Sequence, residues 1–166
     1  MTDAHAAGEA DALSPADSFT ETVQVALPND ANPMGFVLGG TVMHLIDITG
    51  AVAAHRHARA QMVTAAVDDL QFLHPIHVGD LIILRATVTA TFRTSLEVEV
   101  EVFTEKLLTG ERRRTSLAHL TFVSLSAEGR RVAVPPLRLD TDADRQKARA
   151  AEARRAARLA ARQTPD

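Results

Sequence analysis

The feature that most constrains this sequence is a segment of about twenty residues, 38–59, whose apolar side chains cover every face of a helical wheel. A helix at a protein surface normally carries one apolar stripe, whereas a helix that is apolar all round is buried. The histidines and arginines at positions 55–59 suit the negative end of a helix dipole, so the helix is expected to end there. The rest of the chain must therefore wrap around a buried helix.

Strand-like segments lie on both sides of this helix. Polar and apolar residues alternate through residues 19–26, which is the period of a strand with one buried face. Four longer strand-like runs follow the helix, at residues 62–73, 81–92, 96–105 and 115–126. The pattern predicts an α+β fold, in which an antiparallel β-sheet wraps around a long central helix.

The third of these runs has the clearest alternation. Its even positions from Leu96 to Val102 are apolar, and its odd positions from Glu97 to Glu101 are glutamates. Because successive side chains of a strand point to opposite faces of the sheet, the apolar set is expected in the core and the glutamates in water.

The chain divides into three segments. Residues 1–18 carry acids where a signal peptide carries basic residues, and they are predicted to be a flexible leader. Residues 19–139 hold the helix and the strands and are predicted to form one domain. Residues 140–166 are rich in alanine and arginine and begin with Thr and Asp residues suited to capping, so a solvent-facing basic helix with a short tail is expected.

Composition excludes several classes of function. The chain has no cysteine, which excludes disulfides, thiolate metal sites and a cysteine nucleophile, and cytoplasmic localisation is predicted. A net charge of -3 and the lack of Trp and Tyr argue against nucleic acid as a partner. The leader has no apolar run long enough to cross a membrane, and no membrane partner is expected.

Asp47 is the candidate catalytic residue. It is the only carboxylate between Asp30 and Asp68, and it lies in the middle of the most apolar helix. A buried ionised carboxylate is costly unless it is paired, hydrogen-bonded or functional. The alternative to a catalytic role is that the Asp47 side chain is hydrogen-bonded to a neighbouring threonine, histidine or backbone group. His44 lies three residues earlier and could share the same helical face, either as an acid–base partner or as a packed histidine.

Gly39 and Gly40 open the helix, so backbone N–H groups at its positive end can approach a ligand and stabilise a developing oxyanion. The alternative is that the two glycines only allow a tight turn into the helix.

His55 and His57 are close in sequence, but carboxylates at metal-ligand spacing are missing and no metal site is predicted. The sequence has no GxSxG motif, so water rather than serine is the expected nucleophile.

Taken together, ANPMGFVLGGTVMHLIDITGAVAAHRH, VTAAVDDLQFLHPIHVGD, RTSLEVEV and the arginine pair of the tail resemble the acyl-CoA hydrolase branch of the hot-dog superfamily. The resemblance covers roughly residues 20–160, and its most specific part is the spacing from Asn32 through the glycines to Asp47. It implies a hot-dog fold and an acyl-CoA thioesterase of fatty acid metabolism, which hydrolyses fatty acyl-CoA to free fatty acid and CoA.

The resemblance also implies roles for individual residues. Asp47 is the catalytic carboxylate, Asn32 helps to place water or substrate, and Gly40, next to Gly39, lends its N–H to the thioester oxygen. The turn formed by Arg93, Thr94 and Ser95 looks like the family's Gly-Arg-Thr-Ser turn, which is implied to bind CoA, with Phe92 in place of the glycine.

Assembly and cofactors follow from the same resemblance. Asn32 and Asp47 of one site are implied to come from opposite subunits of a homodimer, and the dimers to associate as a trimer of dimers. No cofactor is implied beyond coenzyme A as part of substrate and product. Phe36 and Leu38 depart from the family pattern and leave the acyl-chain preference open.

Two other functions fit parts of the same pattern. A hot-dog dehydratase acting on a 3-hydroxyacyl thioester needs an acid–base pair, for which His44 with Asp47 is the local candidate. A non-catalytic acyl-CoA-binding sensor would use the same cleft, but a binding cleft has no need of a costly buried acid. Within the thioesterase, general-base catalysis and direct attack by Asp47 are both compatible with the sequence.

Overall fold

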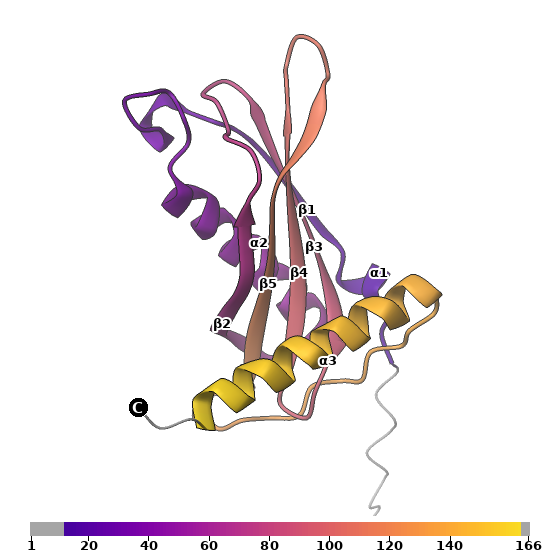
Figure 1. Ribbon diagram of the computed structural model, residues 1–166. Helices are drawn as coiled ribbons and strands as arrows, with labels where there is room; N and C mark the ends of the chain where they lie inside the picture. The colour runs from indigo at the N-terminus through magenta and orange to yellow at the C-terminus, as the bar shows by residue number, and fades with distance from the viewer. Residues whose placement is uncertain (1–11, 164–166) are drawn as a thin grey trace, which may run out of the picture.

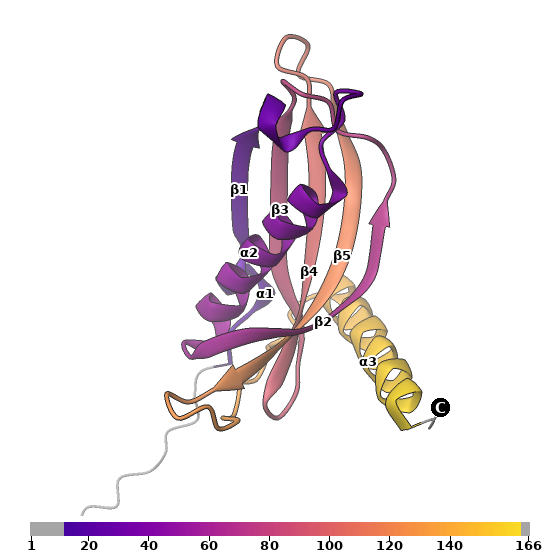
Figure 2. The same ribbon diagram turned by 90° about the vertical axis from the view of Figure 1, so that its left-hand side faces the viewer.

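One antiparallel sheet of five strands, in the order β1-β3-β4-β5-β2, forms the centre of the molecule. The structure is a computed structural model and describes residues 12–163. The long helix α2 (Gly39–Ala58) lies on one face of the sheet and helix α3 (Asp142–Gln163) on the other, as Figures 1 and 2 show. The predicted α+β fold is confirmed. The strands are β1 (Thr20–Val25), β2 (Gln61–Phe72), β3 (Leu81–Thr91), β4 (Ser95–Glu105) and β5 (Arg112–Leu125).

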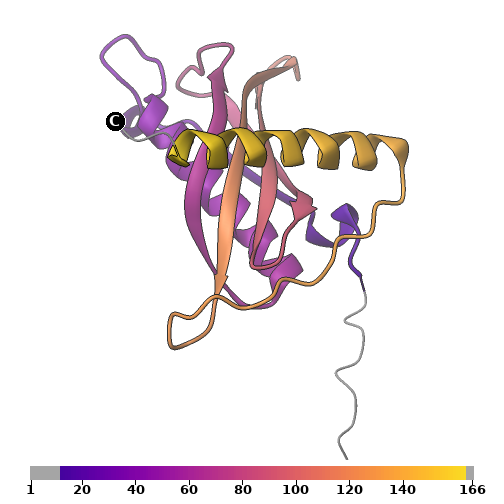
Figure 3. The same cartoon turned by 60° about the horizontal axis from the view of Figure 1, so that its bottom comes forward.

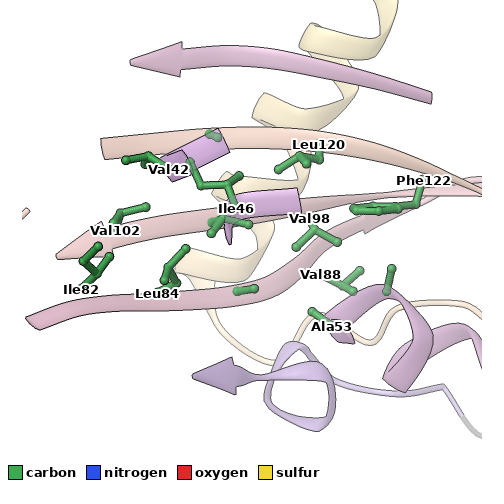
Figure 4. Close-up of a cluster of buried hydrophobic side chains, with 14 of the residues drawn as sticks. Val42, Ile46, Ala53, Ile82, Leu84, Val88, Val98, Val102, Leu120 and Phe122 are labelled. Carbon is green, nitrogen blue, oxygen red and sulfur yellow. The ribbon is translucent and has the colours of Figure 1, made fainter. Parts of the chain in front are cut away.

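The core lies between α2 and the inward face of β3, β4 and β5. Val42, Ile46 and Ala53 of the helix are buried there, against strand side chains that include Val98 and Phe122 (Figure 4). A Cβ atom at Gly50 would lie 3.4 Å from both the Phe122 ring and the Val100 side chain. Glycine at this position therefore lets the helix approach the sheet closely.

The prediction that α2 is buried on every side is wrong for the single chain. The side chains of Met43, Ile48 and Val52 are exposed, because the sheet covers only part of the helix surface. The edge strand β2 also exposes Val63 and Val67. Exposed apolar surface of this kind is typical of a face that another polypeptide covers.

Helix α3 crosses the outer face of the sheet (Figure 3), which corrects two predictions. Glu97 was expected in water, but only 2% of its surface is exposed, and Arg154 donates two hydrogen bonds to it at 2.8 and 2.9 Å. The helix is likewise not wholly solvent-facing, since Ala148 and Ala151 are buried against the sheet. A strand pattern cannot show that a distant helix covers its polar face.

Glu99 is the second glutamate beneath α3. Burial opposes its ionisation, but hydrogen bonds from His119 and from Lys147, the latter at 2.6 Å, lower the pKa of Glu99 to about 2. Glu99 therefore stays ionised at neutral pH and ties α3 to the sheet.

The predicted leader spans residues 1–18, and its residues 1–11 lie outside the described residues. Its last part is folded: helix α1 (Pro15–Ser18) packs on the domain, and the buried Ser18 hydroxyl accepts a hydrogen bond from the Val88 N–H at 3.0 Å. A 3-10 turn, η1 (Pro28–Asp30), follows β1. Within the described range, no helix has both the length and the apolar content needed to cross a membrane.

Candidate active site

A pocket of about 390 Å³ opens between the N-terminal half of α2 and the inner face of β2. Gly40 and Asp47 bring polar groups to it, and most of the remaining lining is apolar. A largely apolar pocket with a few polar groups is the usual form of a small-molecule site. The lining residues are Gly40, Met43, His44, Ile46, Asp47, Thr64, Val67, Leu70 and Leu120.

Asp47 is half-buried in the single chain rather than fully buried as expected. The Thr64 hydroxyl on β2 donates a hydrogen bond to its Oδ1 at 2.6 Å. The β2–β5 register shifts immediately after Thr64, at a bulge. Among the described residues, no donor is paired with Oδ2, so this oxygen is left for a ligand or a water molecule.

His44 lines the same pocket one helical turn before Asp47. No hydrogen bond joins the two side chains in the described part of the chain. The acid–base pair that a dehydratase would need is therefore not formed in this structure.

Gly40 lies in the first turn of α2 and lines the pocket. The N–H groups of a first helical turn have no acceptor within the helix and carry partial positive charge. Nothing lies within 4 Å of the position a Cβ would take at Gly40, whereas at Gly39 a Cβ would be 3.4 Å from the Phe72 ring. Gly40 is thus the more open of the two toward a ligand, and Gly39 packs against Phe72.

Asn32 lies in the loop between η1 and α2. Its side-chain oxygen accepts hydrogen bonds from the backbone N–H of Met34 at 3.0 Å and of Phe36 at 3.1 Å. The loop therefore fixes the side chain, and the amide NH₂ is the end that remains for a ligand. Asn32 does not line the Asp47 pocket of its own chain.

Arg93 and Thr94 lie in the turn between β3 and β4, and Ser95 is the first residue of β4. They line a different pocket, of about 190 Å³, on the outer side of the sheet. The single chain thus brings Gly40 and Asp47 together, and it leaves Asn32 and the Arg-Thr-Ser turn apart from them.

His55 and His57 have structural partners. His57 is buried, and its Nε2 lies 2.9 Å from the Pro135 carbonyl oxygen; burial lowers the pKa of His57. His55 contacts the Ala51 carbonyl oxygen at 2.7 Å. Within residues 12–163, no group of three His, Cys, Asp or Glu side chains is placed to hold a metal ion.

Comparisons of this chain with known proteins all point to one family. A family model described as the thioesterase superfamily matches residues 34–111. The chain is 39% identical over 115 residues to a Bacillus subtilis protein named as an uncharacterised acyl-CoA thioester hydrolase, covering 69% of this chain and 67% of that protein. It is 32% identical to an acyl-CoA thioester hydrolase of Escherichia coli, covering 67% and 86%. It spans only 35% of the human cytosolic acyl coenzyme A thioester hydrolase, at 34% identity.

Two solved structures of acyl-CoA hydrolases superpose on most of this chain. A hexameric acyl-CoA thioesterase, crystallised without ligand, superposes with a TM-score of 0.88 at 34% identity, covering 93% of this chain and 99% of the other. A Staphylococcus aureus acyl-CoA hydrolase in complex with butyryl coenzyme A superposes with a TM-score of 0.82 at 32% identity, covering 90% and 94%.

The S. aureus hydrolase has also been solved as variants in which an asparagine, an aspartate or a threonine is replaced by alanine. In its numbering the aspartate follows the asparagine by 15 positions, and the threonine follows the aspartate by 17. The same intervals separate Asn32, Asp47 and Thr64. Sequence reasoning missed Thr64, because a threonine on a strand carries no local signal of its partner.

Proposed function

This chain belongs to the thioesterase superfamily and is an acyl-CoA thioester hydrolase, and we propose that it hydrolyses fatty acyl-CoA to free fatty acid and coenzyme A with Asp47 as its catalytic carboxylate. The observation that carries this proposal is the pocket itself. It places the free Oδ2 of Asp47 and the first helical turn at Gly40 around one apolar cavity. Cytoplasmic localisation and the lack of a cofactor stay predictions.

Thioester hydrolysis requires little assistance from the protein to the departure of the leaving group. A thiol has a pKa near 8.5 in solution, so a thiolate departs far more readily than an alkoxide. In the proposed reaction Asp47 takes a proton from water as the water attacks the thioester carbon. The N–H of Gly40 stabilises the negative charge that develops on the carbonyl oxygen, and Asn32 orients the water through its amide group.

Direct attack by Asp47 on the thioester carbon is the alternative chemistry. It would release the thiolate and leave a mixed anhydride, which water then cleaves. A single turnover in water enriched in oxygen-18 tests for an anhydride that water cleaves at the Asp47 carbonyl carbon. Label in the Asp47 carboxylate would contradict general-base catalysis, whereas label in the fatty acid alone fits both general-base catalysis and an anhydride that water cleaves at the acyl carbon.

Thr64 is proposed as a positioning residue for Asp47. Replacing Thr64 by alanine removes the hydrogen bond to Oδ1, and we expect kcat to fall about tenfold with KM little changed. Thr64→Ser keeps the hydroxyl and should restore most of the activity. Equal losses in both variants would show that the threonine methyl group, rather than the hydrogen bond, matters.

We propose a homodimer as the minimal active unit. Support comes from the exposed apolar side chains of α2 and β2 and from the absence of Asn32 from the pocket of its own chain. The hexameric relative supports further association of the dimers, which we propose as a trimer of dimers. The mass of the purified protein, measured by light scattering, tests this assembly.

Mixing two inactive variants tests whether one site is shared between subunits. If Asp47 of one subunit works with Asn32 of its partner, a mixed dimer of Asn32→Ala and Asp47→Asn contains one intact site. After unfolding and refolding an equimolar mixture, about a quarter of wild-type activity should return. Each variant refolded alone is the control, and a mixture that stays inactive would place both residues in one subunit.

Release of CoA, followed with a thiol-reactive dye, tests the activity itself. Because the chain has no cysteine, the dye reports only the product thiol. Short, medium and long acyl-CoAs are compared in one assay, which also ranks the substrates. Tight binding of acyl-CoA without release of CoA would favour the sensor, and hydration or dehydration of the acyl chain would favour the dehydratase.

A further inference from the structure

Strand β2 forms one wall of the Asp47 pocket, and the side chains that it contributes do not follow regular strand alternation. These side chains are Thr64, Val67 and Leu70, each three positions from the next. In a regular strand, residues three positions apart point to opposite faces of the sheet. Two irregularities between Thr64 and Leu70 are therefore needed to turn all three side chains toward the pocket.

The first irregularity directly follows Thr64. Thr64 lies opposite Phe122 of β5 and Val67 lies opposite Leu120, so three positions on β2 match two positions on β5. One extra residue in β2 at this point is a β-bulge. Leu120 and Phe122 both belong to the buried cluster drawn in Figure 4. Because residues directly opposite each other lie on the same face of a sheet, Thr64 and Val67 both face α2.

The second irregularity contains Asp69. Asp68 and Gln71 are three positions apart, but their partners on β5 are only two positions apart. Asp69 has a φ of 52°, in the left-handed region that non-glycine residues seldom adopt, although aspartate tolerates it better than most. This second bulge restores the original alternation, so Leu70 faces the pocket and Gln71 faces away from it.

The segment between the two bulges faces the opposite way from the one that regular alternation predicts. Asp68 lies four positions after Thr64 and would share its face in a regular strand, which would place a carboxylate in the pocket. Asp68 instead forms an ion pair with Arg158 of α3, on the outer face of the sheet. Val67 takes its place and keeps this wall of the pocket apolar beyond Thr64.

We propose that Val67 and Leu70 determine the acyl-chain specificity of this pocket, and that Asp69 is the positioning residue for Leu70. The proposal rests on the proposed function, because an acyl-CoA substrate brings an alkyl chain beside Asp47. An alkyl chain is bound by apolar contact, and each methylene group that it buries changes affinity about fourfold. The size of the side chains at positions 67 and 70 then sets how many methylene groups the pocket accommodates.

Calorimetric binding of S-butyl-CoA and S-dodecyl-CoA, thioethers that cannot be hydrolysed, tests this proposal on the full chain. The quantity compared is the ratio of the dodecyl Kd to the butyl Kd. Leu70→Ala enlarges the pocket and should lower this ratio about tenfold, whereas Leu70→Phe narrows it and should raise the ratio about tenfold. Val67→Phe should also raise the ratio, and an unchanged ratio in this variant would exclude Val67. A ratio within about twofold of wild type in both Leu70 variants would overturn the proposal.

Leu117→Ala is the matched control for Leu70→Ala. Leu117 is half-buried like Leu70, but it lies opposite Gln71, on the face of the sheet that points away from the pocket. The control should leave the ratio at its wild-type value. A change equal to that in Leu70→Ala would show a general effect of sheet stability and would contradict the proposal.

Replacements of Asp69 test its positioning role. Asparagine tolerates positive φ and has nearly the same shape, so Asp69→Asn should bind both thioethers as the wild type does. A β-branched side chain opposes positive φ, so Asp69→Val should shift the bulge, displace Leu70 and move the ratio by about threefold or more. Asp69→Ala, which opposes positive φ less strongly, takes its place if the thermal unfolding temperature shows that Asp69→Val does not fold. An unchanged ratio, or an equal change in Asp69→Asn, would contradict this role.

The same compounds separate this proposal from the proposed function. If the wild type bound neither thioether, the proposed function would fail, because acyl-CoA would not be its ligand. If it bound both thioethers but hydrolysed neither butanoyl-CoA nor dodecanoyl-CoA, hydrolysis would fail and the Kd ratio would still decide the specificity proposal. If it hydrolysed both and the ratio stayed constant across the Leu70 variants, the specificity proposal alone would fail.

Discussion

Replacing Asp47 by asparagine is expected to lower kcat for acyl-CoA hydrolysis by about 10²- to 10⁴-fold while the protein stays folded. Asparagine has nearly the same shape and can still accept the hydrogen bond that the Thr64 hydroxyl now donates to Oδ1. It can neither take a proton from water nor attack the thioester, so both proposed routes are blocked. Dye-detected CoA release measures the loss, and the thermal unfolding temperature confirms the fold.

A matched control is Asp142→Asn, which makes the same chemical change at an exposed position of α3 that is distant in the fold from the pocket. Its kcat should equal that of the wild type. Activity within about tenfold of wild type in Asp47→Asn would contradict the assignment and move catalysis to another group. His44, the other titratable side chain of the pocket, would then be tested first.

Replacing Arg154 by alanine is expected to lower the free energy of unfolding by about 3–5 kcal/mol. The change leaves Glu97 without the two hydrogen bonds that it now accepts from Arg154, although only 2% of Glu97 is exposed. Thr89 would remain as a side-chain donor to Glu97, at 2.7 Å, but a neutral hydroxyl does not balance a buried charge. Urea unfolding followed by circular dichroism measures the difference.

Arg149→Ala is the control, because it removes an exposed arginine of the same helix and should change the free energy of unfolding by no more than about 0.5 kcal/mol. The double variant Glu97→Leu/Arg154→Leu removes both charges and should recover most of the stability, since breaking a buried pair costs far more than replacing it. A loss below about 1 kcal/mol in Arg154→Ala would mean that α3 does not hold Glu97 as the structure shows.

Local patterns in the sequence were sufficient for the two long helices and the five strands, but not for the short helix α1, which lies in the predicted leader. The apolar helix of residues 38–59 is α2, and each predicted strand corresponds to an observed strand to within three residues at its ends. The reason is physical: helical and strand periods are set by the chain itself and need no knowledge of distant residues. The unusual position of Asp47 in an apolar helix, and Gly40 at the start of that helix, were visible for the same reason.

Contacts between distant segments were not visible in the sequence. Thr64 became part of the candidate site only when β2 was placed beside α2, 17 residues after Asp47 in the chain. Glu97 proved to be buried only when α3 was placed across the outer face of the sheet. A strand pattern shows which residues share a face, whereas the segment that covers the face is decided by tertiary packing.

The sequence by itself therefore determined the two long helices and the five strands, the α+β class, and the two residues, Gly40 and Asp47, that meet in one pocket. The tertiary structure alone decided the partner of Asp47, the burial of Glu97 and the clustering of arginines from α3 around the Arg-Thr-Ser turn. These depend on strand order and on helix docking, which join residues that lie far apart along the chain and leave no periodic trace in it.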